Sequence, residues 1–496
     1  VFGDENSAVS FDKELSENNI VTIQPDSLRI LHNPLTGWVL YASMGVDAAD
    51  FWAQYDHMYI PELGHNVSVT DYAHTLYIRA SWTDFNPQED VYGWKIDSNL
   101  RAYIEGAYQR NMRLAFRVVV DSRDKRTEFT PQFVKDAGAK GFMNKGKWSP
   151  YSDDPVFQKY YTKFVKALAK DFNDPSKVEF IDGFGLGKWG EYHTMIYSTG
   201  DDTPKKAVFN WVTDIYSQAF DKVPVVINYH RWIGAGKDWV DDEHFAADSE
   251  EMLEEAIKKG YSLRHDAFGM TTYYGSWERR FAEKYRNICP IIMEGGWIVK
   301  SHNYWQDPRG YRKDSHEDVR RGEFDDSKEA HVNMMDFRFG DTKSWFKDAF
   351  DLVRRFLREG GYRLYPSEIS LPLEVSKKTP PTIKHCWNNL GWGYCPTNIP
   401  QWNQKYKVAF ALLDSETNEV RYTFVDTDTD LSKWIKGSPA EYVFEPDMSK
   451  VETGTYVWAV GLVDRSNKDL VGLDIAAKGD ILDSGWLKLS KVSIKK

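Results

Sequence analysis

Cysteine is scarce in this chain: its 496 residues include only Cys289, Cys386 and Cys395. So few cysteines exclude the small disulfide-built scaffolds, and no Cys or His spacing is typical of a metal site. Cys289 lies in an apolar run, which predicts a buried, inert thiol. Cys386 and Cys395 bracket the segment WNNLGWGY, where a loop-closing disulfide and two free thiols are equal alternatives.

Long apolar runs and basic blocks are absent as well. No run approaches the roughly 20 apolar residues of a membrane-spanning helix. The 63 basic and 74 acidic residues are interspersed and the net charge is −11, so nucleic acid and anionic membranes are not expected as partners. The sequence starts at Val1 with a polar segment, which fits a mature N-terminus after removal of an export signal. We therefore expect a secreted, periplasmic or cell-surface protein.

Aromatic residues, in contrast, are abundant. They make up 15% of the chain, with 19 Trp and 28 Tyr. Indole and phenol faces suit flat sugar rings, so this content favours a carbohydrate ligand over the alternative that the rings only fill a large core.

Strand-like and helical segments alternate from residue 29 to residue 361, after a polar lead-in over residues 1–28 that contains one short extended piece, residues 20–23. Eight such alternations predict an α/β fold of the closed (β/α)8 (TIM) barrel type. The expected strands are 39–41, 76–81, 113–120, 178–181, 223–228, 263–269, 289–296 and 331–337, and the expected helices are 95–110, 155–171, 204–219, 250–259, 277–285 and 344–358. Two long insertions, 121–153 and 300–328, are expected as loops on the functional face.

The pattern changes after residue 361. Segments with period-two alternation follow, separated by Asp, Asn, Ser, Pro and Gly turns, at 407–413, 420–424, 456–462 and 486–492. They predict a C-terminal β-sandwich domain over residues 362–496.

Two glutamates stand at the ends of buried strands. Glu191 closes the stretch VEFIDGFGLGKWGEYH, and Glu294 closes CPIIMEGG. Because the ends of all strands of a barrel meet at one face, the two carboxylates are expected to converge there. The alternative of ordinary salt-bridged acids is weaker, since a charge at the glycine-flanked end of an apolar strand is costly without partners or a function.

Paired carboxylates flanking a sugar carry out glycoside hydrolysis. We expect Glu294 as the nucleophile and Glu191 as the general acid and base. A separation of about 5 Å predicts retention of the anomeric configuration, and one of roughly 6.5–9.5 Å predicts inversion.

Two arginines and a lysine are expected near these acids. Arg79, inside an apolar strand, is expected to hold Glu294 ionised. Arg117 either reaches the barrel mouth or turns toward the helix layer. Lys188 precedes Glu191 closely and is a candidate for substrate binding.

Other strand-end residues are candidates for binding the substrate. One of Tyr229 and His230 is expected to hydrogen-bond a sugar hydroxyl or a carboxylate, and Tyr273 or Tyr274 to donate to the nucleophile. Asp266 is expected to be structural. The candidate sugar platforms, each with burial in the core as its alternative, are Trp82, Trp189, Trp232 and Trp297.

The pattern Trp82-x-x-Phe85-x-Pro87-x-Glu89-x-x-Tyr92-x-Trp94 resembles the signature after strand two of retaining clan A barrel glycosidases, which include the family 42 β-galactosidases. Residues 187–193 (GKWGEYH), NPLTGW and WNNLG are similar to the bacterial barrel proteins of the domain of unknown function 4832. The resemblance implies an acid/base at Glu191, a nucleophile at Glu294 and the clan's strand-two arginine at Arg79.

The chain departs from that clan in two places. Gly190 stands where the clan has the Asn that holds the sugar 2-hydroxyl, so His193 or His230 is expected to serve instead. The Trp common on strand eight is not evident in HVNMMDFRF.

Together these features predict a glycoside hydrolase, retaining, that cleaves a β-linkage in a complex glycan without a metal or organic cofactor. An acidic sugar substrate is left open. The competing hypotheses are a carbohydrate-binding protein on a barrel without turnover and, more weakly, a lyase.

Overall fold

The computed structural model describes residues 18–270, 273–297 and 316–496, which form two compact units. The described residues between 35 and 360, with 399–401, make up the first unit, and residues 18–34, 361–398 and 402–496 belong to the second. Within the described ranges, no helix has the length and apolar character needed to cross a membrane.

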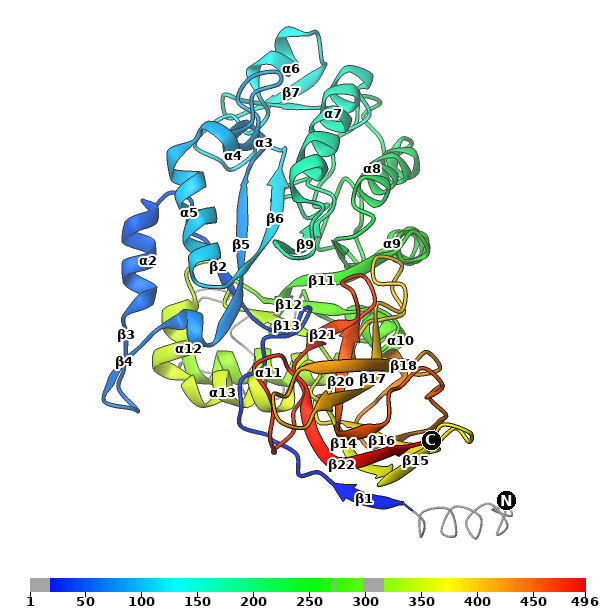
Figure 1. The fold of residues 1–496 in the computed structure, drawn as a ribbon. Coiled ribbons are helices and arrows are strands. Elements are labelled where there is room, and N and C mark those ends of the chain that lie inside the picture. Colours follow the sequence, from blue (N-terminus) through cyan, green and yellow to red (C-terminus); the bar gives the residue numbers. More distant parts are fainter. Residues whose placement is uncertain (1–17, 271–272, 298–315) are drawn as a thin grey trace. The chain divides into compact units, whose positions relative to one another are not determined.

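Eight parallel strands close into a barrel in the first unit, with neighbours in chain order (Figure 1). All eight predicted strands are present, so the predicted (β/α)8 fold is confirmed. They are β2 (Gly37–Tyr41), β5 (Ala73–Ser81), β6 (Arg113–Val119), β9 (Val178–Asp182), β10 (Val225–Asn228), β11 (Tyr261–Phe268), β12 (Ile291–Gly295) and β13 (Met334–Asp336).

Helices surround the barrel and present their apolar stripes to it. The best-formed is α7, which starts at the Asp154 N-cap with Pro155 in its first turn, and buries Phe157, Tyr161 and Phe164. The longer helices are α2 (Ala48–Asp56), α5 (Ser98–Gln109), α7 (Pro155–Phe172), α8 (Lys205–Ala219), α9 (Glu243–Lys258), α10 (Ser276–Tyr285), α11 (His316–Glu329), α12 (Thr342–Asp348) and α13 (Phe350–Glu359).

The helices differ from the prediction in three respects. Helix α9 starts seven residues before the predicted 250, because Asp242 caps it through bonds from His244 N and Phe245 N. The single helix predicted over 344–358 is two helices that meet at Ala349. Helices α2 and α11 were not predicted. Helix α11 lies in a segment dominated by charged residues, which hides its apolar side.

The insertions contain short elements of their own. Residues 121–153 include α6 (Gln132–Asp136) and the hairpin of β7 (Gly141–Asn144) and β8 (Lys147–Pro150). Residues 300–315 of the second predicted insertion lie outside the described residues. The remaining short elements of this unit are β3 (Met58–Ile60), β4 (His65–Val67), the 3-10 turn η1 (Val69–Asp71), α3 (Trp82–Phe85) and α4 (Gly93–Ile96).

The second unit contains two sheets. One has the order β1-β14-β16-β19, and the other has the order β15-β22-β20-β17-β18 with β21 beside β20. The strands are β1 (Asn19–Thr22), β14 (Leu364–Leu371), β15 (Glu374–Ser376), β16 (Ile383–Asn389), β17 (Tyr406–Asp414), β18 (Val420–Asp426), β19 (Ala440–Phe444), β20 (Gly454–Asp464), β21 (Leu470–Leu473) and β22 (Leu487–Lys495); a 3-10 turn, η3 (Leu431–Lys433), precedes β19.

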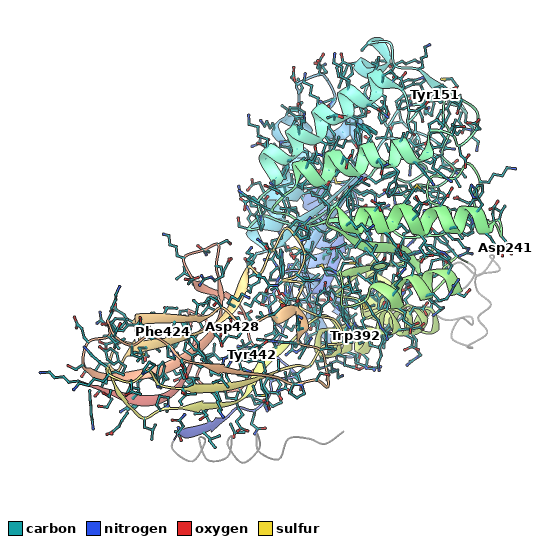
Figure 2. The ribbon with its side chains drawn as sticks, turned by 90° about the vertical axis from the view of Figure 1, so that its right-hand side faces the viewer. Tyr151, Asp241, Trp392, Phe424, Asp428 and Tyr442 are labelled. Atoms are coloured by element: carbon teal, nitrogen blue, oxygen red, sulfur yellow. The ribbon has the colours of Figure 1, made fainter. Side chains whose placement is uncertain are left out.

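The two sheets face each other as a sandwich. His385 of β16 bonds Asp426 of β18 through Nε2 at 2.8 Å, and its ring lies 5.1 Å from the ring of Phe410 on β17. The same His385 stacks on Tyr442 of the first sheet, which Figure 2 labels together with Phe424 of the second. The predicted β-sandwich is therefore present.

The extended piece predicted over residues 20–23 of the lead-in overlaps strand β1. β1 pairs with β14 in antiparallel register, from Asn19 opposite Leu371 to Thr22 opposite Glu368. Residues 18–34 thus belong to the β-rich unit, because the short pattern NIVT completes the edge of its sheet. Cys289, Cys386 and Cys395 are free thiols in the structure.

Candidate active site

Glu191 and Glu294 line one pocket of about 510 Å³. Glu294 lies near the end of β12, and Glu191 lies in the loop that follows β9. Each residue is only 4% exposed. The structure thus brings together two acids that are remote along the chain, at the end of the barrel where the strands finish.

A single guanidinium joins the two glutamates. Arg117 of β6 is fully buried, and its Nη1 lies 2.7 Å from Glu191 Oε1 while its Nη2 lies 3.4 Å from Glu294 Oε2. Its Nε donates to Asp182 Oδ2 at 2.9 Å. Because both glutamate oxygens contact the same planar group, they lie within roughly 8 Å of each other, a range that spans both the retaining and the inverting separations.

A second buried arginine fixes Glu294 from the other side. Arg264 of β11 contacts Glu294 Oε2 through Nη2 at 2.7 Å and Asp336 Oδ2 through Nη1 at 2.9 Å. Burial raises the pKa of Asp336 to about 7, and the nearby charge of Glu294 adds to this, while Arg264 opposes it. Arg264 was not predicted, although it lies inside a predicted strand, as Arg79 and Arg117 do.

Arg79 takes a different partner from the predicted one. Its Nη1 lies 3.9 Å from Glu191 Oε1 and donates to the Tyr41 hydroxyl at 3.5 Å. Arg264, rather than Arg79, makes the close contact with Glu294. Arg79 and Arg117 are register neighbours on β5 and β6, so both turn inward and the alternative of Arg117 facing the helix layer is wrong.

His193 stands beside Glu191 in a closed hydrogen-bond chain. Its Nδ1 donates to Asp238 Oδ2 at 2.5 Å, and its Nε2 therefore accepts the hydroxyl proton of Tyr273 at 2.6 Å. The same Nε2 is 3.9 Å from Glu191 Oε2. Both His193 and Tyr273 line the pocket, but the Tyr273 hydroxyl serves His193 rather than the predicted nucleophile.

His230 supports the loop of Glu191 from below and does not line the pocket. Its Nδ1 accepts from Trp232 N–H at 3.1 Å, so its Nε2 donates to the Glu191 carbonyl at 2.7 Å. Burial, with the neighbouring His193, lowers its pKa well below the ordinary value, which keeps the ring neutral. The predicted contact of His230 with a sugar is replaced by a contact with the backbone.

The loop carrying Glu191 folds back tightly. Lys188 N–H donates to the His193 carbonyl at 3.0 Å, and Gly187 and Gly190 have φ of 74° and 73°. A Cβ on Gly187 would lie 2.9 Å from the His193 carbonyl oxygen, so the turn requires glycine there.

Besides His230, the predicted substrate-binding residues that do not line the pocket are Trp82, Arg117, Lys188, Tyr229 and Tyr274. Trp82 is fully buried against Tyr161 and other rings of the helix layer, with Nε1 bonded to Asn86. The hydroxyls of Tyr229 and Tyr274 bond each other at 2.8 Å in the core. Lys188 pairs with Asp124 at 2.7 Å. The predictions for Trp82, Tyr229 and Tyr274 are wrong, because a strand-end position does not reveal which side of the strand a side chain takes. Lys188 lies beside Asp124, which lines the pocket, and its role stays a prediction.

The aromatic wall of the pocket consists of three indoles and a phenol. Trp189 and Trp297 were predicted, and Trp239, in the loop before α9, was not. Trp239 and Trp297 are 49% and 58% exposed, so their faces are accessible to a ligand. Trp232, the remaining candidate platform, is buried and packs on Tyr273.

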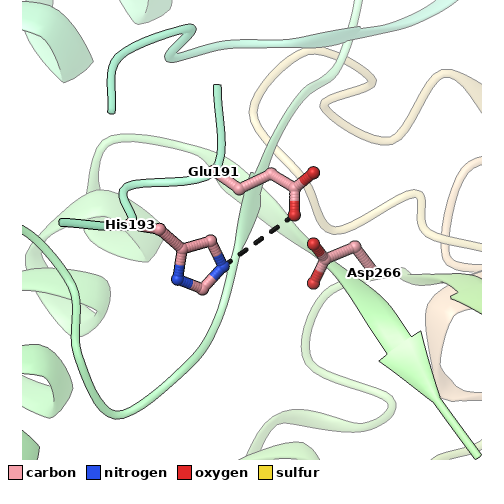
Figure 3. Close-up of side chains that lie close together, drawn as sticks. All are labelled: Glu191, His193 and Asp266. Atoms are coloured by element: carbon pink, nitrogen blue, oxygen red, sulfur yellow. Dashed lines mark ion pairs between the residues drawn. The ribbon is translucent and has the colours of Figure 1, made fainter. Parts of the chain in front are cut away.

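Asp266 of β11 also lines the pocket, in contrast to the structural role predicted for it. One ligand-type atom from each of Glu191, His193 and Asp266 lies within 4.8 Å of the others (Figure 3). These are the residue types that bind divalent ions.

No protein-family model matches the sequence, and no curated protein sequence matches it significantly. The resemblance to the domain of unknown function 4832 and to family 42 β-galactosidases therefore stays a prediction.

Solved structures do match. Endo-glycoceramidase II from Rhodococcus sp. has 12% identity and a TM-score of 0.39 over 86% of this chain and 99% of that chain. An endoglucanase from Pseudomonas stutzeri has 10% identity and a TM-score of 0.38 over 68% and 97%, and a GH30 endoxylanase from Clostridium papyrosolvens has 8% and 0.37 over 86% and 97%. Because these TM-scores lie below 0.5, the case for a function depends on this chain's own residues.

Proposed function

We propose that this chain is a glycoside hydrolase, with Glu294 as the nucleophile and Glu191 as the general acid and base, that cleaves a β-glycosidic bond with retention. The observation that carries the proposal is the pair of buried glutamates held on the single guanidinium of Arg117 at the wall of one pocket. Two carboxylates at the wall of a ring-lined pocket are the machinery that glycoside hydrolysis requires.

The surroundings of the two acids support their different roles. Glu294 Oε2 is held by Arg264 at 2.7 Å and contacts Arg117 at 3.4 Å, so two guanidinium groups fix the position of the oxygen proposed to attack. Glu191 also contacts Arg117, but only through Oε1. Its Oε2 accepts no hydrogen bond from any residue that the structure describes. This oxygen is therefore available to carry a proton to the leaving group.

The proposed reaction has two steps. Glu191 protonates the glycosidic oxygen while Glu294 attacks the anomeric carbon, which breaks the bond to the leaving group and forms a glycosyl ester. Glu191 then removes a proton from water, whose oxygen attacks the same carbon and releases Glu294.

A series of aryl β-glycosides tests the two roles separately. Glu294→Gln should abolish turnover for every leaving group. In Glu191→Gln, kcat/KM should fall about 10²–10⁴-fold with a poor leaving group. It should fall much less with dinitrophenolate, which departs without a proton. Glu278→Gln is the matched control, because Glu278 is a buried glutamate outside the pocket. Equal losses in Glu191→Gln for both leaving groups would contradict the assignment, and NMR of the first product anomer tests retention.

Glycan binding without turnover is the second candidate function. It is favoured by the exposed faces of Trp239 and Trp297, which suit sugar rings whether or not a bond is cleaved. A wild-type chain that binds glycans in a glycan screen but releases no product, judged by mass spectrometry, would favour this candidate over hydrolysis.

A further inference from the structure

Glu191, His193 and Asp266 form a cluster that the proposed hydrolysis does not explain. Glu191 and His193 come from the loop after β9, and Asp266 comes from β11, so the three side chains meet from two parts of the barrel (Figure 3). Glu191 and His193 are 4% and 1% exposed, and Asp266 is partly buried.

Two carboxylate oxygens in this cluster have unmet hydrogen-bonding capacity. Neither Glu191 Oε2 nor Asp266 Oδ1 accepts a hydrogen bond from any described residue. His265 Nδ1 lies 3.6 Å from Asp266 Oδ1, but that nitrogen accepts from Ala267 N–H and so has no proton to give. Leaving a buried acceptor unsatisfied costs about 1–3 kcal/mol, and more for a charged group, so a cation between the two oxygens would be stabilised.

The histidine is oriented as a metal ligand. The side chain of Asp238 is buried and accepts a hydrogen bond from His193 Nδ1–H, which leaves the lone pair on Nε2, the nitrogen nearer Glu191. A carboxylate behind a ligating histidine is the usual outer partner in metal sites, where it fixes the tautomer and raises the basicity of the ligand. The Tyr273 hydroxyl now bonds this lone pair and would give up that one bond to an ion.

The donor set selects the class of ion. One imidazole and two carboxylates suit Zn²⁺ or Mn²⁺ better than Mg²⁺ or Ca²⁺, which prefer oxygen alone. Ligand atoms lie about 2.0–2.2 Å from Zn²⁺. Around a tetrahedral ion such ligands lie about 3.4 Å apart, so three atoms within 4.8 Å of one another must approach by up to roughly 1.4 Å to share one ion. Arg117 and Arg79 oppose a cation here, whereas Glu294 and Asp238 favour it.

We propose that Glu191, His193 and Asp266 bind a divalent transition-metal ion, and that the ion inhibits the enzyme by occupying Glu191 Oε2. The inhibition rests on the proposed function, because it removes the oxygen that delivers the proton. The binding itself does not depend on that function. Sequence spacing did not indicate this site because its third ligand comes from another strand.

Binding is tested with Zn²⁺ alone, on the full chain stripped with EDTA and dialysed. Calorimetry should show one ion per chain. His193→Ala and Asp266→Asn should each weaken binding at least tenfold, Asp238→Asn should weaken it about tenfold through the outer partner, and Glu278→Gln should leave it unchanged. An absence of saturable binding up to millimolar Zn²⁺ would overturn the site. Affinities equal to that of the wild type in His193→Ala and Asp266→Asn would overturn it as well.

Co²⁺ gives a measurement that needs no variant. In the wild-type chain it should produce the intense visible absorption of a tetrahedral or five-coordinate ion with a nitrogen ligand, and the weak spectrum of hydrated Co²⁺ would count against the site. Zn²⁺ should inhibit aryl glycoside hydrolysis competitively and EDTA should reverse it. Activity that needs Zn²⁺ would overturn the inhibitory role, and a chain with no hydrolytic activity but with Zn²⁺ bound would overturn the proposed function alone.

Discussion

The strongest test of the site is the removal of the Arg117 charge. This guanidinium is 0% exposed and contacts Asp182, Glu191 and Glu294. In Arg117→Met a similar volume remains, but the acids lose their shared cation. Breaking a buried ion pair from one side costs about 3–5 kcal/mol, so we expect a loss of that size in the free energy of unfolding.

Arg117→Lys separates charge from geometry. A lysine keeps one positive charge but is a single point, so it cannot reach both glutamates as the planar fork does. We expect a smaller loss of stability, about 1–3 kcal/mol, from the missing charge-assisted bonds. Because the two carboxylates are then no longer aligned, kcat/KM on an aryl β-glycoside should fall about 10²-fold.

Urea unfolding followed by tryptophan fluorescence gives the stability, and initial rates give kcat/KM. The matched control is Arg113→Lys, which changes the other arginine of β6 at the opposite end of the strand, where it pairs with Glu179 at 2.7 Å. That variant should keep its catalytic rate. An Arg117→Met protein as stable as the wild type would refute the reasoning, since the acids would then not need the cation.

Three further outcomes follow from burial. Burial raises the pKa of Glu278 from 4.5 to about 7 against the effect of Arg231, so the folded chain holds this proton more tightly than the unfolded chain and stability falls as the pH rises from 4.5 toward 7. The change in the free energy of unfolding between pH 5 and pH 8 should therefore be smaller in Glu278→Gln than in the wild type, by up to about 3 kcal/mol. Glu283→Gln, on the exposed side of α10, should behave like the wild type, and melting temperatures at the two pH values check both variants. Trp82→Ala should lose about 3–5 kcal/mol of stability in urea with an unchanged KM, whereas Trp239→Ala should keep its stability and raise KM up to roughly tenfold; the opposite pattern would contradict the assigned positions. Burial raises the pKa of Cys289 to about 12, so peptide mapping after thiol labelling at pH 8 should find it unmodified unless the chain is first unfolded.

The barrel could be predicted because its strands are short apolar runs between turn residues. Buried parallel strands such as 225–228 (VVIN) and 291–293 (IIM) are covered on both faces, and this leaves a continuous apolar run in the sequence. Helix α11 could not be predicted, because its many charged residues hide the few apolar ones that face inward, such as Val319. Strand β1 overlaps the extended piece predicted over residues 20–23, but so short a piece does not reveal which sheet it joins.

The candidate site was only partly predictable for a geometric reason. Glycine-flanked strand ends identified Glu191 and Glu294, since those positions are fixed by the barrel. Trp239 and Asp266 reach the same pocket from a loop and from inside a strand, and sequence does not reveal such directions. Trp82, in contrast, was predicted to contact a sugar but packs into the helix layer, away from the pocket.

The charged layer beneath the pocket explains why the acids are where they are. Arg79 lies in register with Arg117, and Arg117 lies in register with Asp182. Two neighbouring strands thus bring like charges together inside the barrel, and the carboxylates of Asp182, Glu191 and Glu294 compensate for them. An apolar layer of the same volume is often as stable or more stable than such a network, so stability alone does not account for it. What the network provides is fixed carboxylate oxygens at the pocket wall, and both hydrolysis and metal binding depend on oxygens held in this way.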